Sequence, residues 1–172
     1  MVRVDEMENV ATRYFYAGKM GAGKSTHSLQ LAKELKAVHI SEDEWLAALY
    51  PDQISNFEEY LKLASRIKPL LSKHIQQILT AGTDVVLDFP ANTRQQREWF
   101  KQLFDHAQAK HQLIYIDADN EVCLEQIKHR RIEQPARAKF DTEAMFQHVT
   151  QYFEAPQPQE GFLIKTIRKE SH

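Results

Sequence analysis

The residues with the clearest chemical potential form a short glycine-rich segment near the start of the chain. Residues 18–25 read Gly-Lys-Met-Gly-Ala-Gly-Lys-Ser and satisfy the full G-x-x-x-x-G-K-[ST] pattern of a phosphate-binding loop. Its glycines allow backbone N–H groups to point into one concavity, and the dipole of a following helix favours bound anions. Lys24 is then expected to contact the β- and γ-phosphates of a nucleotide, and the hydroxyl of Ser25 to ligate Mg²⁺. The residues predicted to bind nucleotide here are Gly18, Gly21, Ala22, Gly23, Lys24, Ser25 and Thr26.

The use of glycine along the chain supports this interpretation. The chain has only five glycines in 172 residues, and three of them lie in this one segment. Glycine is the residue that allows tight turns and close approach of the backbone to a ligand. The alternative, a structural strand-to-helix turn with an exposed lysine, accounts less well for the full pattern and for this concentration of glycine.

A second candidate is a carboxylate that closes an apolar run. Asp88 follows Val85-Val86-Leu87, as the aspartate of a Walker B segment does. It would hold Mg²⁺ directly or through water, together with Ser25, or help to position a second substrate. The structural alternative is an ordinary aspartate at the end of a strand.

Short apolar segments alternate with helical patterns along the chain. The predicted strands cover residues 14–17, 38–41, 84–88, 112–117 and 162–167. The predicted helices cover 24–36, 43–49, 55–80, 93–109, 120–131 and 142–153, and Pro69 is expected to break or kink the third. Strands separated by helices predict an α/β fold in which a parallel sheet is covered on both faces.

Composition limits the classes of protein that this chain can be. Hydrophobic residues make up 42% and charged residues 27%, which is typical of a globular domain, and the length favours a single domain over residues 1–172. The net charge of -2 disfavours non-specific nucleic-acid binding. The single cysteine, Cys123, fits a reducing compartment. Neither a membrane span nor a signal peptide is evident, so we expect a cytoplasmic protein.

The phosphate loop and the elements around it resemble small P-loop kinases of the nucleoside-monophosphate-kinase-like group. Within that group the chain most resembles the AAA_33-type phosphotransferases, which include zeta toxins, chloramphenicol phosphotransferase and polynucleotide 5′-hydroxyl kinases. The resemblance extends over nearly the whole chain, and the phosphate loop is its most specific part. It implies a three-layer P-loop NTPase fold with a five-stranded parallel sheet in the order 2-3-1-4-5 and a helical lid.

The resemblance assigns a role to a carboxylate after the second predicted strand. Relatives often carry hydrophobic-Ser-x-Asp-Asp here, with an aspartate that faces the acceptor hydroxyl, and Ile40-Ser41-Glu42-Asp43-Glu44 matches it. The match places on Asp43 the task of accepting or orienting the hydroxyl proton during attack on the γ-phosphorus. The structural alternative is a helix start, in which Ser41 and Glu44 form a capping box and Asp43 favours the dipole.

Arginines late in the chain resemble those of a kinase lid. Relatives place lid arginines where this chain has Arg130, Arg131 and Arg137, and these would close over ATP and stabilise charge on the transferring phosphoryl group. Arg130 and Arg137 are predicted to be catalytic and Arg131 to bind the nucleotide. The alternative is that these charges only complement a helix dipole and a solvated loop.

A further segment resembles the acceptor side of the family. Relatives tend to carry Asp-x-x-Asn-x-x-Arg after the third strand, where this chain has Phe89-Pro90-Ala91-Asn92-Thr93-Arg94. Asn92 and either Arg94 or Arg97 are therefore candidates to line the acceptor side, although Arg97 also fits a solvated helix position.

The resemblance implies an ATP- and Mg²⁺-dependent phosphotransferase that acts on a hydroxyl of a small molecule. We expect a monomer or weak dimer with no membrane partner. Three alternatives stay open: an NTPase that hydrolyses ATP without a defined acceptor, a nucleotide-dependent binding protein, and a polynucleotide 5′-hydroxyl kinase. The last would need a basic channel with stacking aromatic residues, which the balanced charge disfavours.

Overall fold

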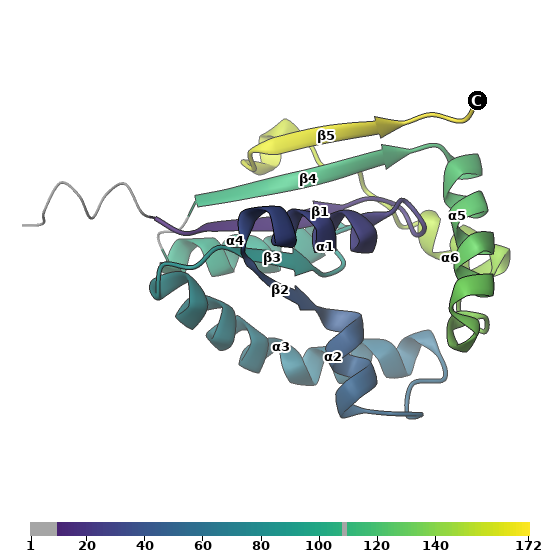
Figure 1. The fold of residues 1–172 in the computed structure, drawn as a ribbon, viewed down its shortest axis with the longest axis horizontal. Helices are drawn as coiled ribbons and strands as arrows, with labels where there is room; N and C mark the ends of the chain where they lie inside the picture. The colour runs from purple at the N-terminus through teal and green to yellow at the C-terminus, as the bar shows by residue number, and fades with distance from the viewer. Residues whose placement is uncertain (1–9, 108–109) are drawn as a thin grey trace, which may run out of the picture.

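The protein is an α/β domain built on one parallel sheet, described here from a computed structural model that covers residues 10–107 and 110–172 (Figure 1). The strands are β1 (Thr12–Ala17), β2 (Val38–Ser41), β3 (Val85–Asp88), β4 (Lys110–Ala118) and β5 (Ile164–Lys169). The α-helices are α1 (Lys24–Leu35), α2 (Glu42–Leu49), α3 (Phe57–Thr80), α4 (Arg94–Ala107), α5 (Asn120–Glu133) and α6 (Glu143–Thr150). Two short 3₁₀ helices are η2 (Pro135–Arg137) and η3 (Pro158–Glu160).

The order of the strands confirms the predicted topology. All neighbouring strands pair in parallel, and the sheet runs β2-β3-β1-β4-β5. Consequently the carboxyl ends of the strands lie at one edge, where the phosphate loop, α2 and α5 also begin (Figure 1). In open α/β sheets this edge is where ligands bind.

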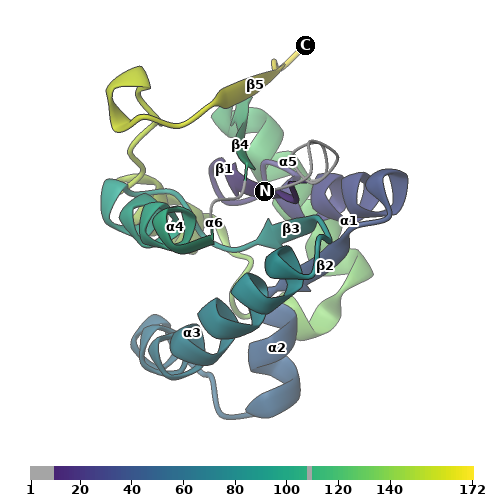
Figure 2. The same cartoon turned by 90° about the vertical axis from the view of Figure 1, so that its left-hand side faces the viewer.

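Two hydrophobic cores, one on each face of the sheet, explain why the strands are apolar runs. Helices α1 and α5 cover one face, and α3 and α4 cover the other (Figure 2). The side chains of Val85, Val86 and Leu87 in β3 are all fully buried because successive residues point to opposite, covered faces.

Helix α3 corrects one sequence-based expectation. Of the break or kink expected at Pro69, the break does not occur, because one helix runs from Phe57 to Thr80 with Pro69 inside it. Pro69 is exposed, and the buried stripe of Leu63, Ile67, Leu71 and Ile75 continues past it. Burial of that stripe outweighs the lost hydrogen bond.

Most other boundaries shift by a few residues. The helix expected over 142–153 is shorter and ends at Thr150. Its start agrees with the expectation, because Thr142 caps α6 by accepting a hydrogen bond from the amide of Met145 at 3.1 Å. The end of the helix expected over 93–109 falls partly on residues 108–109, outside the described part of the chain. Of the helices that the structure describes, none has the length and apolar character needed to cross a membrane.

A buried ion pair joins α4 to the segment before β5. Arg97 is fully buried, its Nε lies 2.7 Å from Glu160 Oε1, and its Nη1 donates to the carbonyl of Ala91 at 2.9 Å. Arg97 is thus neither a solvated helix residue nor part of the acceptor side. The helical pattern around residue 97 did not indicate this burial, because its partner is 63 residues away.

Glu160→Ala is expected to lower the free energy of unfolding by about 3 kcal/mol, because it leaves the buried guanidinium of Arg97 without its partner charge. Lys128→Ala is the matched control, since it breaks the exposed pair with Glu125 and should cost less than about 1 kcal/mol. Urea unfolding of both variants measures the difference. Equal losses would contradict a stabilising role for the buried pair.

Candidate active site

A wide cavity opens at the carboxyl edge of the sheet. Its volume is about 2740 Å³, which exceeds the roughly 300–1,000 Å³ of a typical single-ligand pocket. The phosphate loop, α2 and the start of α3, the segment after β3, the lid around η2, and the end of β5 all line it. The cavity therefore has room for a nucleotide and a second molecule.

The phosphate loop has the backbone shape that its sequence predicts. Gly21 and Gly23 have φ of +78° and +98°, a region that side chains other than glycine rarely adopt. A Cβ at Gly21 would also lie only 2.5 Å from the carbonyl oxygen of Cys123 on α5. Gly23 is the N-cap of α1, and among the described residues no side chain caps that helix start. Its first amides are therefore available to an anion.

The side chain of Lys24 lies against its own loop. Its Nζ donates to the carbonyls of Gly18 and Lys19, the latter at 3.1 Å. Burial lowers the pKa of Lys24 to about 8, although the nearby carboxylate of Asp88 opposes this shift. Removal from water costs this ammonium favourable hydration, so a bound polyphosphate is the partner that would best compensate it.

This lowered pKa predicts that nucleotide affinity depends on pH. The affinity for ADP should be constant well below pH 8 and should fall above it by up to about tenfold per pH unit, because Lys24 then loses the charge that attracts phosphate. Calorimetric titration between pH 6.5 and 9.5 measures it. Lys24→Arg stays charged throughout and should show a flat profile, so equal slopes in the two proteins would contradict the assignment.

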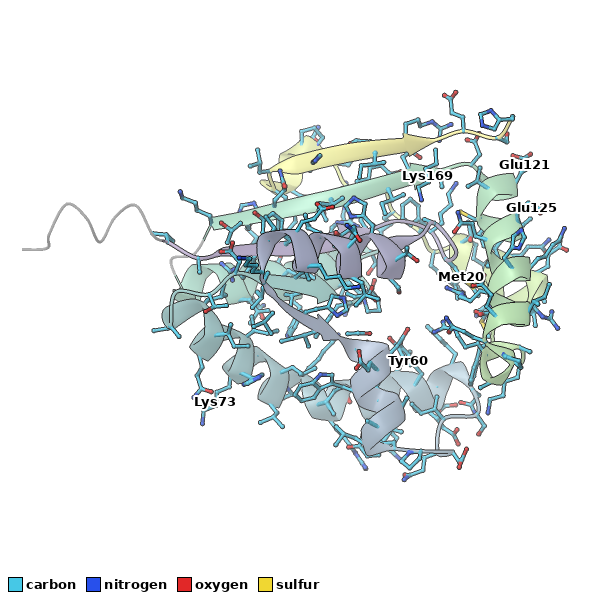
Figure 3. The ribbon with its side chains drawn as sticks, viewed as in Figure 1. Met20, Tyr60, Lys73, Glu121, Glu125 and Lys169 are labelled. Atoms are coloured by element: carbon cyan, nitrogen blue, oxygen red, sulfur yellow. The ribbon has the colours of Figure 1, made fainter. Side chains whose placement is uncertain are left out.

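Two side chains from distant parts of the chain hold the phosphate loop in place. Asn92 Oδ1 accepts the amide of Gly18 at 2.9 Å, so this residue supports the loop as well as lining the cavity. Lys169, at the end of β5, donates to the carbonyl of Ala22 at 3.0 Å (Figure 3). No spacing in the sequence indicates these contacts, because they join positions 74 and 147 residues apart.

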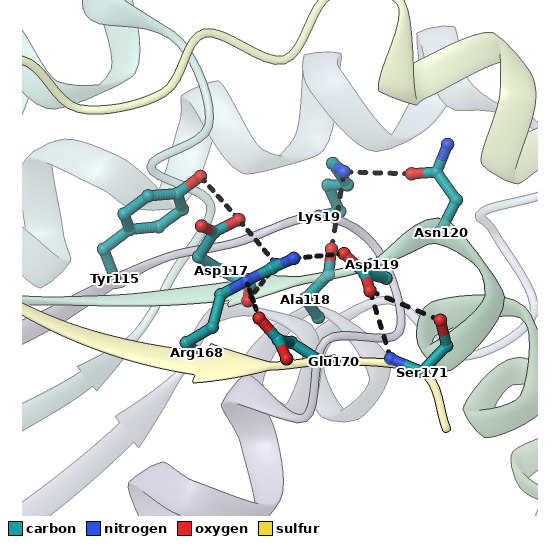
Figure 4. Close-up of polar contacts among 9 residues, drawn as sticks. All are labelled: Lys19, Tyr115, Asp117, Ala118, Asp119, Asn120, Arg168, Glu170 and Ser171. Carbon is teal, nitrogen blue, oxygen red and sulfur yellow. Dashed lines mark hydrogen bonds and ion pairs between the residues drawn. The ribbon is translucent and has the colours of Figure 1, made fainter.

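A polar network fixes the corner between β4 and α5 beside the loop (Figure 4). Lys19 donates to Asn120 Oδ1 at 2.9 Å, and Arg168 donates to the carbonyl of Asp117 at 3.0 Å and to the carboxylate of Asp119. Asp119 also accepts the amide of Ser171 at 3.0 Å. The network ties the end of β5 to the start of α5 around the phosphate loop.

The two predicted carboxylates lie at neighbouring strand ends. Asp88 pairs in register with Ser41, and the Ser41 hydroxyl caps α2 by accepting the amide of Glu44 at 3.3 Å. Asp43 lies in the first turn of that helix and lines the cavity. Asp43 keeps access to solvent through the cavity, yet the surrounding protein raises its pKa by desolvation, opposed chiefly by Arg137.

The predicted catalytic residues converge on one another. The pKa of Asp43 is shifted by the charges of Arg137, Asp88, Arg130 and Lys24. The pKa of Lys24 is shifted in turn by the charges of Asp88, Arg130 and Asp43. All five line the same cavity, together with Ser25 and Thr26. The structure thus brings together residues that are spread over more than a hundred positions of the chain.

The three lid arginines differ in their contacts and in their exposure to solvent. Arg130 Nε and Nη2 lie 2.7 and 2.6 Å from the carboxylate of Asp141, and Arg137 Nε lies 3.2 Å from the same group. Arg131 is exposed and is not among the described residues that line the cavity. Adjacent helical residues point about 100° apart, so Arg131 projects in a different direction from Arg130. The structure does not bring Arg131 to the predicted nucleotide site.

The side of the cavity toward α2 and α3 is rich in aromatic residues. Trp99 stacks on Phe89 with ring centroids 5.7 Å apart, and Lys68 Nζ lies 5.4 Å from the Trp99 centroid. The Tyr60 hydroxyl, beside α2, donates to the buried Glu42 at 2.5 Å (Figure 3). Arg94, which was a candidate for the acceptor side, is exposed, and its Nε lies 3.8 Å from Oε2 of Glu154.

Comparison with solved structures identifies the fold. A candidate kinase from Chloroflexus aurantiacus superposes with a TM-score of 0.72 at 22% identity, covering 93% of this chain and 86% of its own. The APS kinase CysC of Mycobacterium tuberculosis, in complex with AMPPNP and APS, has a TM-score of 0.61 at 17% identity, with 91% and 88% covered. Kti12 of Chaetomium thermophilum, in complex with ADP-AlF3, has a TM-score of 0.62 at 18% identity, with 90% and 88% covered. The shared feature is the kinase-like P-loop fold.

Sequence comparison agrees with the fold. No curated protein sequence matches this chain. Residues 15–156 match a family described as an AAA domain, and the match extends from β1 and the phosphate loop to the segment after α6. This match covers most of the chain, and the P-loop fold supports it independently. The chain therefore belongs to the AAA_33 family of AAA domains.

Proposed function

We propose that this protein is an ATP- and Mg²⁺-dependent phosphotransferase that moves the γ-phosphate to a hydroxyl of a small molecule. The observation that carries the proposal is the convergence of Lys24, Asp43, Asp88, Arg130 and Arg137 around one cavity beside the phosphate loop. Positive groups and carboxylates around one cavity are what phosphoryl transfer between two bound substrates needs.

Each group has a separate task in the proposed reaction. Lys24 and the amides at the start of α1 hold the β- and γ-phosphates. Arg130 and Arg137 stabilise the negative charge that spreads over the transferring phosphoryl group. Asp43 accepts the proton of the acceptor hydroxyl as its oxygen attacks phosphorus, and its raised pKa makes it a stronger base than an ordinary aspartate.

The residues present also fit a magnesium ion. The exposed Ser25 and the half-buried Asp88 both line the cavity next to the phosphate loop, and oxygen ligands of this kind suit Mg²⁺. When bound, the ion neutralises charge on the nucleotide phosphates.

The aromatic side of the cavity supports a small acceptor with an apolar part. Phe57, Tyr60 and Trp99 line the same cavity as Asp43, and the charge of Asp43 acts on Tyr60. Phe57 and Tyr60 stack with ring centroids 6.2 Å apart. Aromatic faces bind flat or apolar groups, while Asp43 can orient a hydroxyl.

A transfer screen tests this proposal. The protein is incubated with γ-labelled ATP, Mg²⁺ and panels of hydroxylated metabolites, nucleosides and antibiotics. A labelled acceptor that depends on active protein supports the proposal. Release of labelled phosphate alone, with every acceptor, would favour ATP hydrolysis without an acceptor and contradict it.

A further inference from the structure

One buried carboxylate holds two of the lid arginines at once. Asp141 lies between η2 and α6, is 1% exposed, and accepts hydrogen bonds from Arg130 on α5 and from Arg137 on η2. Its own amide also donates to the carbonyl of Arg137 at 2.9 Å. We propose that Asp141 is a positioning residue that orients both guanidinium groups for the transition state of phosphoryl transfer, an inference that rests on the proposed function.

The geometry of the contacts supports orientation. Arg130 meets Asp141 through Nε and Nη2, and two parallel contacts to one carboxylate fix the plane and direction of a guanidinium. Arg137 joins through Nε alone. Each guanidinium therefore keeps further N–H donors that can bind phosphate oxygens.

The charges of Asp141, Arg130 and Arg137 also support a positioning role. One carboxylate shared by two guanidiniums leaves a net positive charge. Both arginines act to lower the pKa of Asp43, and Arg130 also acts to lower the pKa of Lys24. A preorganised positive group beside the phosphate loop stabilises the negative charge of the transferring phosphoryl group without having to reorient during the reaction.

The packing of the helices distinguishes Arg130 and Arg137 from Arg131. Arg130 and Asp141 are 11 residues apart and meet only because α5 packs beside α6. Arg131 is adjacent in sequence, but it is exposed and is not among the described residues that line the cavity. Asp141 thus accounts for which lid arginines reach the cavity.

The test uses a transition-state mimic, so it does not need the acceptor. The affinities of the protein for ADP and for ADP with aluminium fluoride are measured by calorimetry in the presence of Mg²⁺. In Asp141→Asn the affinity for ADP should stay within about threefold, whereas the extra affinity conferred by aluminium fluoride should fall by roughly 10²-fold, because small misplacements of catalytic groups have effects of this size. Glu143→Gln, an exposed acid at the start of α6, is the matched control and should retain both affinities.

The outcomes distinguish the inference from the proposed function. If aluminium fluoride adds no affinity even in the unmodified protein, both the proposed function and this inference fail. If it adds affinity and Asp141→Asn keeps it, only the positioning role fails. A loss of ADP affinity equal to the loss with aluminium fluoride would also overturn that role, because it would mean general damage to the site.

Two further variants separate positioning from folding. Adding Asp141→Asn to a protein that already carries Arg130→Ala and Arg137→Ala should cause no further loss with aluminium fluoride, whereas an independent structural role would multiply the losses. Asp141→Glu keeps the charge but moves it by one methylene, and it replaces the Asn variant if that protein does not fold. It should bind ADP normally and lose part of the aluminium fluoride effect, and an undiminished effect would overturn the inference.

Discussion

Lys24→Ala is expected to abolish phosphoryl transfer, with a loss of at least about 10³-fold, the scale at which removing one charged group from a phosphoryl-transfer site acts. The side chain already lies within the loop, where its Nζ contacts the carbonyls of Gly18 and Lys19. No other cation lies in the loop at a position equivalent to Nζ, since Lys19 is directed instead toward Asn120 at 2.9 Å. The β- and γ-phosphates would therefore lose their main positive contact from the loop.

Nucleotide binding and turnover are measured together for this variant. Lys33→Ala is the control, because Lys33 is an exposed lysine on the same helix and does not line the cavity. The control should behave as the unmodified protein does. Unchanged turnover in Lys24→Ala would contradict the assignment of residues 18–25 as a phosphate-binding loop.

Asp43→Asn is expected to reduce acceptor phosphorylation by roughly 10²–10⁴-fold while nucleotide affinity changes little. The amide keeps the size and polarity of the side chain but removes its charge and basicity. The cap of α2 is the Ser41 hydroxyl, which this substitution leaves intact. A purely helix-stabilising role would instead cost only about 0.3–1 kcal/mol of stability and leave turnover nearly normal.

The pH profile gives Asp43 a second, independent readout. Because its pKa is raised, the proton-accepting form is lost as pH falls through that raised value, and the rate should fall with it in the unmodified protein. Asp43→Asn should lack this acid limb. Glu58→Gln, in the exposed first turn of α3, removes a comparable interaction with a helix dipole and should change neither the rate nor its pH dependence. The acceptor found in the transfer screen serves as substrate, and a retained acid limb in Asp43→Asn would assign the titration to another group.

Residues that act through local patterns could be predicted from the sequence. The phosphate loop depends on neighbours within eight positions, and its glycines have the conformations that the motif requires. The strands and helices follow from the spacing of apolar residues, and the sheet order follows from the family resemblance. Because all strands are parallel, the placement of Asp43 and Asp88 at strand ends was sufficient to bring them to one edge.

Contacts between distant segments depended on the tertiary structure. Arg97 looks like a surface residue of an amphipathic helix until Glu160 is folded against it, and Pro69 looks like a helix break until the buried stripe of α3 is packed. Asn92 was expected on the acceptor side, and besides lining the cavity its side chain accepts the amide of Gly18, a contact that the sequence did not indicate. Periodicity reports which residues share a face of one element, but it carries no information about which other element covers that face.

The lid shows this division most clearly. The sequence by itself showed that a cluster of arginines follows the fourth predicted strand, and the family resemblance predicted lid roles for Arg130, Arg131 and Arg137. Only the tertiary structure decided that Arg130 and Arg137 share Asp141 at the cavity while Arg131 stays in solvent. The physical reason is that a guanidinium is oriented by the carboxylate it meets in space, and that carboxylate is buried beside it only after α5 and α6 have packed together.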